Sequence, residues 1–240
     1  TAGATEVIGQ IAWATRPAAS TNIVCIGDDF PSVTYPWLRV AEVTGAEVRL
    51  AIAGVQPNEN TVDNIALMVD GSTAVICVSH VLYHTGERLD LDRLRALARA
   101  AGALLVIDVT QSAGAVDLDV GRLDPVSAVA SGYQWLRRPG GAAVAYVSPR
   151  QQATFRPAIP GWKGTPNPFD FDARTVRHAP GARRLELSTM AYGAALGLGA
   201  AMTYLYEIGV ARIERHNGRL LEYLVDGLTE LDADVVTPAP

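Results

Sequence analysis

Short apolar runs alternate with longer helical patterns between residues 23 and 147. Each run has the length of a buried strand, and the runs occupy residues 23–26, 47–51, 74–79, 103–108, 126–130 and 142–147. Strands that alternate with helices are typical of a mostly parallel sheet with helices on both faces. The pattern therefore predicts a three-layer α/β fold with about six or seven strands.

Helical periodicity is clearest over residues 91–101, where Gly102 supplies the stop. The apolar positions of that helix are Leu91, Leu94, Leu97 and Ala98. Two long helices are expected near residues 190–208 and 210–230. Residues 156–182 are instead rich in proline, glycine and aromatic side chains, which predicts an irregular segment crossing the domain rather than a linker.

The ends of the sequence bear on its domain organisation. The chain opens on Thr1, and the apolar pair Val235-Val236 resembles the start of another strand. We expect residues 1–232 to form one large domain and residues 233–240 to begin a smaller C-terminal domain that is otherwise missing. On this interpretation the sequence is a piece of a longer protein.

Charge and hydropathy narrow the classes of partner. The formal net charge is −5 and the arginines are scattered, so we expect neither nucleic acid nor an anionic membrane surface as a partner. The most apolar stretch, residues 190–206, is interrupted by three glycines, which favours a buried helix over a membrane span. Cys25 and Cys77 lie inside apolar runs, and the lack of a disulfide framework or secretory signal favours the cytoplasm.

Asp108 closes the apolar run at residues 103–108, which places a carboxylate at the mouth of a buried strand. Ligands bind at such strand ends in open α/β sheets. Two interpretations remain from the residue alone: a cap or turn aspartate, or a carboxylate that keeps a heterocyclic nitrogen protonated so that the ring accepts electrons. In the second case Gln111 could hydrogen-bond a substituent of the ring.

Other side chains could bind a phosphate and a planar ring. Ala4 and Thr5 begin a helical pattern whose N-terminus offers free N–H groups to an anion, although a threonine there is also an ordinary cap. Ser131 and Tyr133 bring hydroxyl groups to a second strand end. Phe30 could stack on a ring or belong to the core. The four histidines form no convincing metal site, so we predict none.

Three stretches carry a resemblance when they are taken together and in order. Residues 79–86 read SHVLYHTG, residues 108–114 read DVTQSAG, and residues 131–136 read SGYQWL. They resemble the class V aminotransferase superfamily of fold-type I pyridoxal 5'-phosphate (PLP) enzymes, over nearly the whole chain. The sequence is most similar to the branch that holds kynureninases, cysteine desulfurases and isopenicillin N epimerase-like proteins.

The resemblance implies a role for each candidate toward the cofactor. Asp108 would pair with the pyridine nitrogen of PLP, Gln111 would contact its 3'-oxygen, and Phe30 would stack on its ring. The groups implied for the phosphate are the backbone N–H groups near Ala4 and the hydroxyls of Thr5, Ser131 and Tyr133. The substrate would be a small amino acid.

Two further implications concern the assembly and the reactive amine. The resemblance implies a homodimer with a shared active site, to which Trp162 and Thr189 would contribute across the interface. Gln134 occupies the place of the lysine that would form the Schiff base. An amide can neither make that bond nor move a proton as an amine does. The only lysine in the chain, Lys163, falls in a loop.

The glutamine leaves three interpretations open. The chain could be an aminotransferase, desulfurase, lyase or epimerase whose lysine was replaced deliberately. It could instead be a natural enzyme that uses pyridoxamine 5'-phosphate or unlinked PLP and a different base. It could also be a catalytically silent homologue that acts as a binding or scaffold subunit. Gln111 stands where a kynureninase would have histidine, so recognition of an aryl substrate is not supported.

Overall fold

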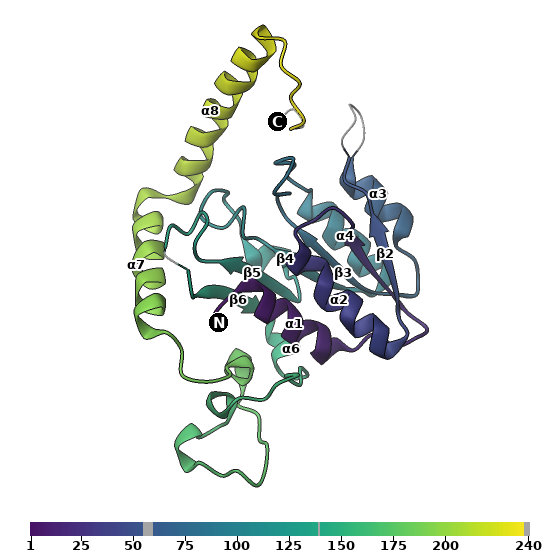
Figure 1. The fold of residues 1–240 in the computed structure, drawn as a ribbon, viewed down its shortest axis with the longest axis vertical. Coiled ribbons are helices and arrows are strands. Elements are labelled where there is room, and N and C mark those ends of the chain that lie inside the picture. Colours follow the sequence, from purple (N-terminus) through teal and green to yellow (C-terminus); the bar gives the residue numbers. More distant parts are fainter. Residues whose placement is uncertain (55–59, 139, 238–240) are drawn as a thin grey trace.

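Six strands form one sheet at the centre of the molecule (Figure 1). The computed structural model describes residues 1–54, 60–138 and 140–237, and the strand order is β2-β1-β3-β4-β5-β6. The first five strands run parallel, and β6 pairs antiparallel with β5. The strands are β1 (Asn22–Ile26), β2 (Glu47–Ala51), β3 (Thr73–Ser79), β4 (Leu104–Asp108), β5 (Ser127–Ser131) and β6 (Ala143–Val147). The predicted α/β fold is confirmed.

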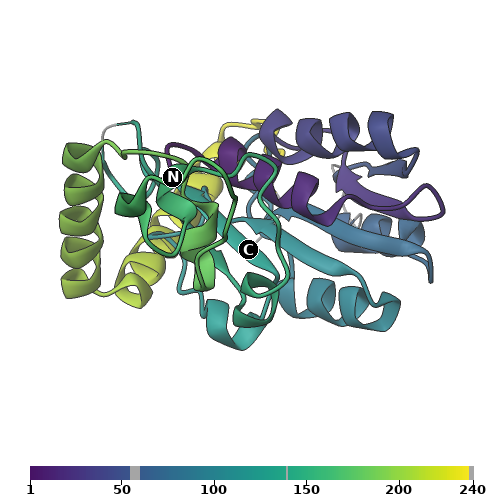
Figure 2. The ribbon, with the colours of Figure 1, turned by 90° about the horizontal axis from the view of Figure 1, so that it is seen from below.

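Helices cover both faces of the sheet (Figure 2). On one face, α1 (Ala4–Thr15) and α2 (Pro31–Thr44) bury Ile8 and Trp37 against Cys25 of β1. On the other face, side chains of α4 (Leu91–Ala101) and α7 (Tyr192–Ile208) belong to the same hydrophobic cluster as Ile76 and Ile107. The shorter helices are α3 (Thr61–Met68), α5 (Val120–Leu123) and α6 (Pro149–Gln152). Because successive strand residues point to opposite faces, each face has its own core.

The bounds of α4 follow from its local sequence. Asp90 caps the helix by accepting a hydrogen bond from the backbone N–H of Arg93 at 3.0 Å. The helix ends at Gly102, whose φ of 70° is a left-handed conformation that favours glycine. These are the predicted bounds, and the buried residues Leu91, Leu94 and Ala98 lie on the predicted face.

Residues 156–182 leave the layers and form the lower part of Figure 1. Their regular structure is limited to short 3-10 turns, namely η1 (Trp162–Gly164), η2 (Pro168–Asp170) and the start of η3 (Gly181–Leu185). The segment is attached to α1, since Gln10 accepts a hydrogen bond from the N–H of Ala158 at 2.9 Å. An irregular crossing segment is the predicted arrangement.

The last two helices form the left edge of Figure 1. α7 begins two residues after its predicted start, whereas α8 (Val210–Glu230) has its predicted bounds and buries none of its residues. Within the described ranges no single helix is long and apolar enough to cross a membrane, although α7 and α8 pass that test as a pair bent by 74°. The C-terminal domain stays a prediction, and residues 238–240 lie outside the described residues.

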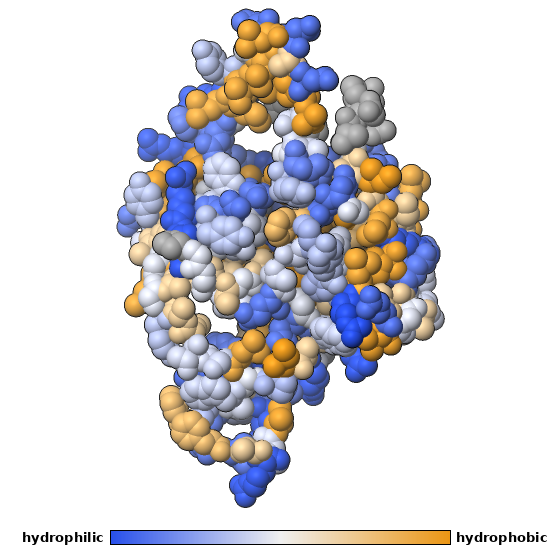
Figure 3. Space-filling model, in the orientation of Figure 1, coloured by the Kyte–Doolittle hydropathy of each residue, from blue (hydrophilic) through white to orange (hydrophobic). Residues whose placement is uncertain are grey.

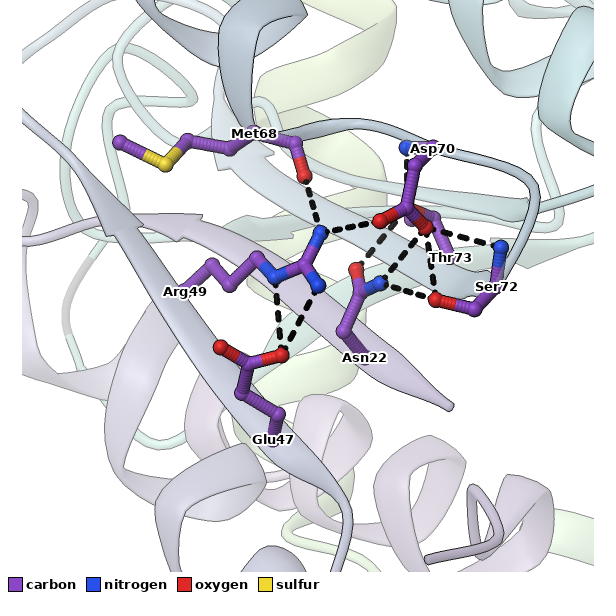
Figure 4. A network of polar contacts seen from close by, with 7 residues as sticks. All are labelled: Asn22, Glu47, Arg49, Met68, Asp70, Ser72 and Thr73. Atoms are coloured by element: carbon purple, nitrogen blue, oxygen red, sulfur yellow. Dashed lines mark hydrogen bonds and ion pairs between the residues drawn. The ribbon is translucent and has the colours of Figure 1, made fainter. Parts of the chain in front are cut away.

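A polar network joins the amino ends of the first three strands (Figure 4). The amide of Asn22, on β1, donates to Asp70 at 3.0 Å and to the hydroxyl of Ser72 at 2.8 Å. Arg49, on β2, donates to the other carboxylate oxygen of Asp70 at 2.6 Å and to Glu47 at 2.9 Å. The network lies at the opposite end of the strands from their carboxyl ends, so it braces the sheet rather than the candidate site.

Candidate active site

The carboxyl ends of β3, β4 and β5 meet the amino ends of α1 and α2 at one cavity of about 220 Å³. Residues far apart in the sequence line it: Ala4, Thr5, Phe30, Ser32, Ser79, Tyr83, Asp108, Thr110, Gln111, Ser131, Tyr133 and Gln134. Eight of the predicted site residues are in this set. The remaining two, Trp162 and Thr189, lie elsewhere in the same chain.

Asp108 forms the buried end of the cavity. It is the last residue of β4, lies beside Ser79 of β3 in the register, and is 6% exposed. Burial raises its pKa to about 6, the hydrogen bonds from Thr110 oppose that rise, and the charge of Asp29 adds to it. No ion pair found among the described residues includes Asp108. The carboxylate is therefore available to a cationic N–H of a ligand.

Thr110 links the ends of two strands at the cavity wall. Its N–H donates to Oδ1 of Asp108 at 2.7 Å, and its hydroxyl accepts a hydrogen bond from the N–H of Ser131 at 3.1 Å. Ser131 is the last residue of β5. The bonds fix the spacing between Asp108 and the Ser131 end of the cavity.

The turn after β5 carries Tyr133 and Gln134, and it is folded tightly. A Cβ at Gly132 would lie 2.7 Å from the carbonyl oxygen of Ala142, so only glycine fits that close approach. Arg138 closes the turn, since its N–H donates to the carbonyl of Gly132 at 3.1 Å and its guanidinium to that of Gly140 at 2.9 Å. The turn thereby holds Tyr133 and Gln134 at the cavity wall.

The start of α1 presents polar groups at the other side of the cavity. The N-cap residue is Gly3, and no side chain caps the first N–H groups of the helix. Thr5 is thus not the cap, and its hydroxyl lies 2.7 Å from that of Ser32 at the start of α2. Free N–H groups and two hydroxyls together suit an anionic ligand group.

Aromatic side chains form the outer wall. Phe30 is 46% exposed, and its ring meets the ring of Tyr83 edge-on with 5.7 Å between centroids. Tyr83 lies in turn against His84, whose Nε2 is 3.4 Å from a carboxylate oxygen of Asp28. A half-exposed phenylalanine at the mouth of a cavity is placed to contact a ligand rather than to fill the core.

Comparison with known protein families shows which family the chain belongs to. The family model for aminotransferase class-V matches residues 1–239. The chain belongs to this family. The resemblance seen in the three sequence stretches is thereby confirmed for the family as a whole, while the assignment of Gln134 to the lysine position stays a prediction.

The proteins to which this chain is similar include enzymes with different named activities. The kynureninase of Deinococcus radiodurans is 30% identical over 234 residues, which cover 95% of this chain and 55% of that protein. An apo structure of the cysteine desulfurase from Thermococcus onnurineus NA1 matches with a TM-score of 0.86 and 25% identity, covering 97% of this chain and 57% of that one. A lysine-to-alanine mutant of C-DES, with glycine covalently linked to its PLP cofactor, matches with a TM-score of 0.86 and 24% identity, covering 96% and 61%. The chain thus spans little more than half the length of these relatives.

Two predicted site residues of this class-V chain lie outside the 220 Å³ cavity. Thr189 lines a different cavity of about 450 Å³ beside α1 and β6, and Trp162 lines one of about 370 Å³ in the irregular segment. Lys163 lies over the rings of Trp162 and Phe169, with its Nζ 4.4 Å and 4.9 Å from their centroids. A role for Trp162 and Thr189 within one chain is therefore not supported, and the role across a dimer interface stays a prediction.

Four lining residues were not predicted from the sequence: Ser32, Ser79, Tyr83 and Thr110. Each is adjacent to a recognised feature, since Ser32 follows Phe30, Ser79 and Tyr83 belong to the first matched stretch, and Thr110 lies between Asp108 and Gln111. For Ser79 and Thr110, position at or just after a strand end was the available signal. No group of potential metal ligands occurs in the part of the chain that the structure describes.

Proposed function

We propose that this chain contains the PLP-binding part of an enzyme that transforms a small amino acid. The observation that carries the proposal is the convergence of Asp108, Phe30 and the start of α1 on one cavity. They come from separate elements, and each offers the chemistry that a different portion of PLP requires. Membership of the class-V family supports the same cofactor.

The residues present fit PLP as a ligand bound without a covalent link. The buried carboxylate of Asp108 has no basic partner among the described side chains, which suits a protonated ring nitrogen. The free N–H groups of α1 and the hydroxyls of Thr5 and Ser131 suit a phosphate. No lysine lines the cavity, so nothing there can form a Schiff base.

PLP, when bound, supplies a ring that accepts the electrons of a carbanion at the α-carbon of an amino acid. The chain would support that chemistry by orienting groups. Asp108 would hold the proton on the ring nitrogen, Gln111 would contact the 3'-oxygen, and Phe30 would restrict the tilt of the ring. Gln134 would contribute hydrogen bonds and would move no proton at neutral pH.

The reaction belongs, in this proposal, to the aminotransferase, desulfurase, lyase or epimerase class, and the enzyme acts in the cytoplasm. We also propose a homodimer in which Trp162 and Thr189 approach the partner's cofactor. Its support is the exposure of large apolar side chains in the irregular segment, where Trp162, Phe169 and Phe171 are 37%, 67% and 73% exposed. Such residues are typical of an interface.

Two other candidate functions follow from Gln134. Since this residue lines the cavity and provides no amine, the chain could serve as a silent binding subunit, or as an enzyme that works with pyridoxamine 5'-phosphate. The three functions differ in what happens to an added amino acid. An active enzyme changes it chemically, whereas a silent subunit at most binds it.

The test is to incubate the protein, loaded with PLP or with pyridoxamine 5'-phosphate, with a panel of amino acids and 2-oxo acids in D₂O. Mass spectrometry of the small molecules detects α-deuteration, loss of sulfur or transfer of the amino group. We expect at least one of these changes, above the level given by free cofactor. If both loaded forms leave every compound unchanged while still binding the cofactor, the silent-subunit function is the correct one.

A further inference from the structure

A second buried carboxylate lies behind the wall of the cavity and does not itself line it. Asp29 follows β1 and is 5% exposed. One of its oxygens accepts a hydrogen bond from the hydroxyl of Ser79 at 2.7 Å, and the other accepts one from the N–H of Ser79 at 2.8 Å. The first oxygen also accepts one from the N–H of Phe30 at 2.6 Å. Asp29 thus holds two residues that line the cavity.

Burying the carboxylate of Asp29 costs free energy, which indicates that its hydrogen bonds to Ser79 and Phe30 have a role. Burial raises the pKa of Asp29, and the hydrogen bonds from Ser79 and Phe30 oppose the rise. An apolar residue here would avoid that cost but would leave the N–H of Ser79 without a partner in the core. Asp28, its neighbour, is instead 42% exposed and accepts a hydrogen bond from the N–H of Ala53, while its other carboxylate oxygen lies 3.4 Å from Nε2 of His84, which contacts Tyr83 of the cavity wall.

We propose that Asp29 is a positioning residue that fixes the ring of Phe30 and the hydroxyl of Ser79 for the bound cofactor. The inference rests on the proposed function, because it concerns the same site. Ser79 donates its hydroxyl proton to Asp29, so its oxygen lone pairs remain for a donor within the cavity. The N–H bond to Asp29 sets the direction in which the chain leaves β1, and with it the position of Phe30 at the start of α2.

Asp29 also acts on Asp108, the proposed partner of the ring nitrogen. Ser79 lies between Asp29 and Asp108, since it bonds to the first and is paired in register with the second. The charge of Asp29 contributes to the raised pKa of Asp108. Asp29 therefore influences three residues that line the cavity: Phe30, Ser79 and Asp108.

The first experiment compares three variants without any cofactor: Asp29→Ala, Asp29→Asn and the control Asp226→Asn, at an exposed position of α8 outside the cavity lining. Amide hydrogen exchange, followed by NMR, reports on the two N–H groups that Asp29 accepts. We expect exchange at Phe30 and Ser79 to become at least about tenfold faster in Asp29→Ala, to change less in Asp29→Asn, and to be unaltered in the control. Unchanged exchange in Asp29→Ala would overturn the inference whatever the protein binds.

The second experiment adds PLP and measures its affinity and its visible circular dichroism, which depends on how the ring is held. Asp29→Ala should bind PLP about tenfold more weakly and alter the dichroism, Asp29→Asn should recover part of both, and Asp226→Asn should behave as the unaltered chain. Faster exchange combined with unaltered affinity and dichroism would mean that Asp29 is structural only, and would overturn the inference. Failure of the unaltered chain to bind PLP would instead reject the proposed function.

A double-mutant cycle covers the case in which Asp29→Ala does not fold. If Asp29 acts through Phe30, the double mutant Asp29→Asn/Phe30→Leu should lose less PLP affinity than expected from multiplying the fold losses of the two single mutants. Effects that multiply independently would contradict the positioning role.

Discussion

At the scale of single residues, the site combines groups that cost stability with groups that bind. Asp108 is buried beside a second carboxylate, and this arrangement raises its pKa to about 6. A surface aspartate would serve the fold better. The cost is typical of a functional site, where a group is held ready for a ligand that is not part of the chain.

Replacing Asp108 by asparagine should therefore stabilise the cofactor-free protein at neutral pH. Because the folded-state pKa is raised from 3.8 to about 6, ionisation costs the folded state up to about 3 kcal/mol, and wild-type stability falls as the pH rises through this window. Urea unfolding should give Asp108→Asn a free energy of unfolding about 1–3 kcal/mol above wild type at pH 7, and a much smaller gain at pH 4. Asp226→Asn, on the exposed face of α8, is the control. A variant that is less stable than wild type at pH 7 would contradict the account of Asp108.

Gln134 gives a second residue-scale prediction. With Gln134→Lys, added PLP and borohydride reduction should leave a pyridoxyl group on residue 134, detected by peptide mass mapping, because that position lines the cavity. Gln134→Arg is the matched control, since it adds the charge but no reactive amine. An adduct on Lys163 alone, or none at all in a folded variant, would show that residue 134 is not the place of the reactive amine.

At the scale of elements, local sequence was enough for most of the fold. β2, α4 and α8 have their predicted bounds, and the other strands differ from theirs by one residue at one or both ends. Strand ends could be recognised as site positions because parallel strands end at one edge. The contacts of Asp29 could not be predicted, since they depend on which strands are neighbours: β1 pairs with β3, two strands later in the chain.

The turn after β5 offers an element-scale test. Gly132→Ala places a Cβ 2.7 Å from the carbonyl oxygen of Ala142, so the turn must move or the chain must strain. We expect a loss of about 1–3 kcal/mol in the free energy of unfolding, together with weaker PLP binding. Gly193→Ala in α7, where a Cβ meets nothing within 4 Å, should be neutral or slightly stabilising. Equal stability and PLP affinity for Gly132→Ala and wild type would show that the close approach does not shape the site.

At the scale of the whole molecule, apolar side chains remain on the surface. Orange patches in Figure 3 mark such positions, and α8 alone exposes Leu220, Leu221 and Leu224. The irregular segment adds Trp162, Phe169 and Phe171. Large exposed apolar areas of this kind favour an association with another protein surface, and the proposed homodimer would cover part of them.

Sedimentation velocity tests the proposed homodimer. We expect the wild-type chain to sediment as a dimer at micromolar concentration, and Phe169→Asp to shift it toward monomer because a charge would be buried at the interface. Phe171→Asp should act similarly, while Tyr206→Asp, on α7, serves as an exposed aromatic control. A wild-type chain that stays monomeric at every concentration would contradict the shared active site.

Equilibrium dialysis of PLP against the unaltered chain and against Asp108→Ala tests most directly whether this cavity binds PLP. We predict one PLP per chain, bound reversibly and lost on extensive dialysis, because Gln134 forms no covalent link. We also predict binding at least about tenfold weaker in Asp108→Ala, where the ring nitrogen loses its carboxylate partner. Equal affinity for the two proteins, or no specific binding to either, would contradict the assignment of this cavity to the cofactor.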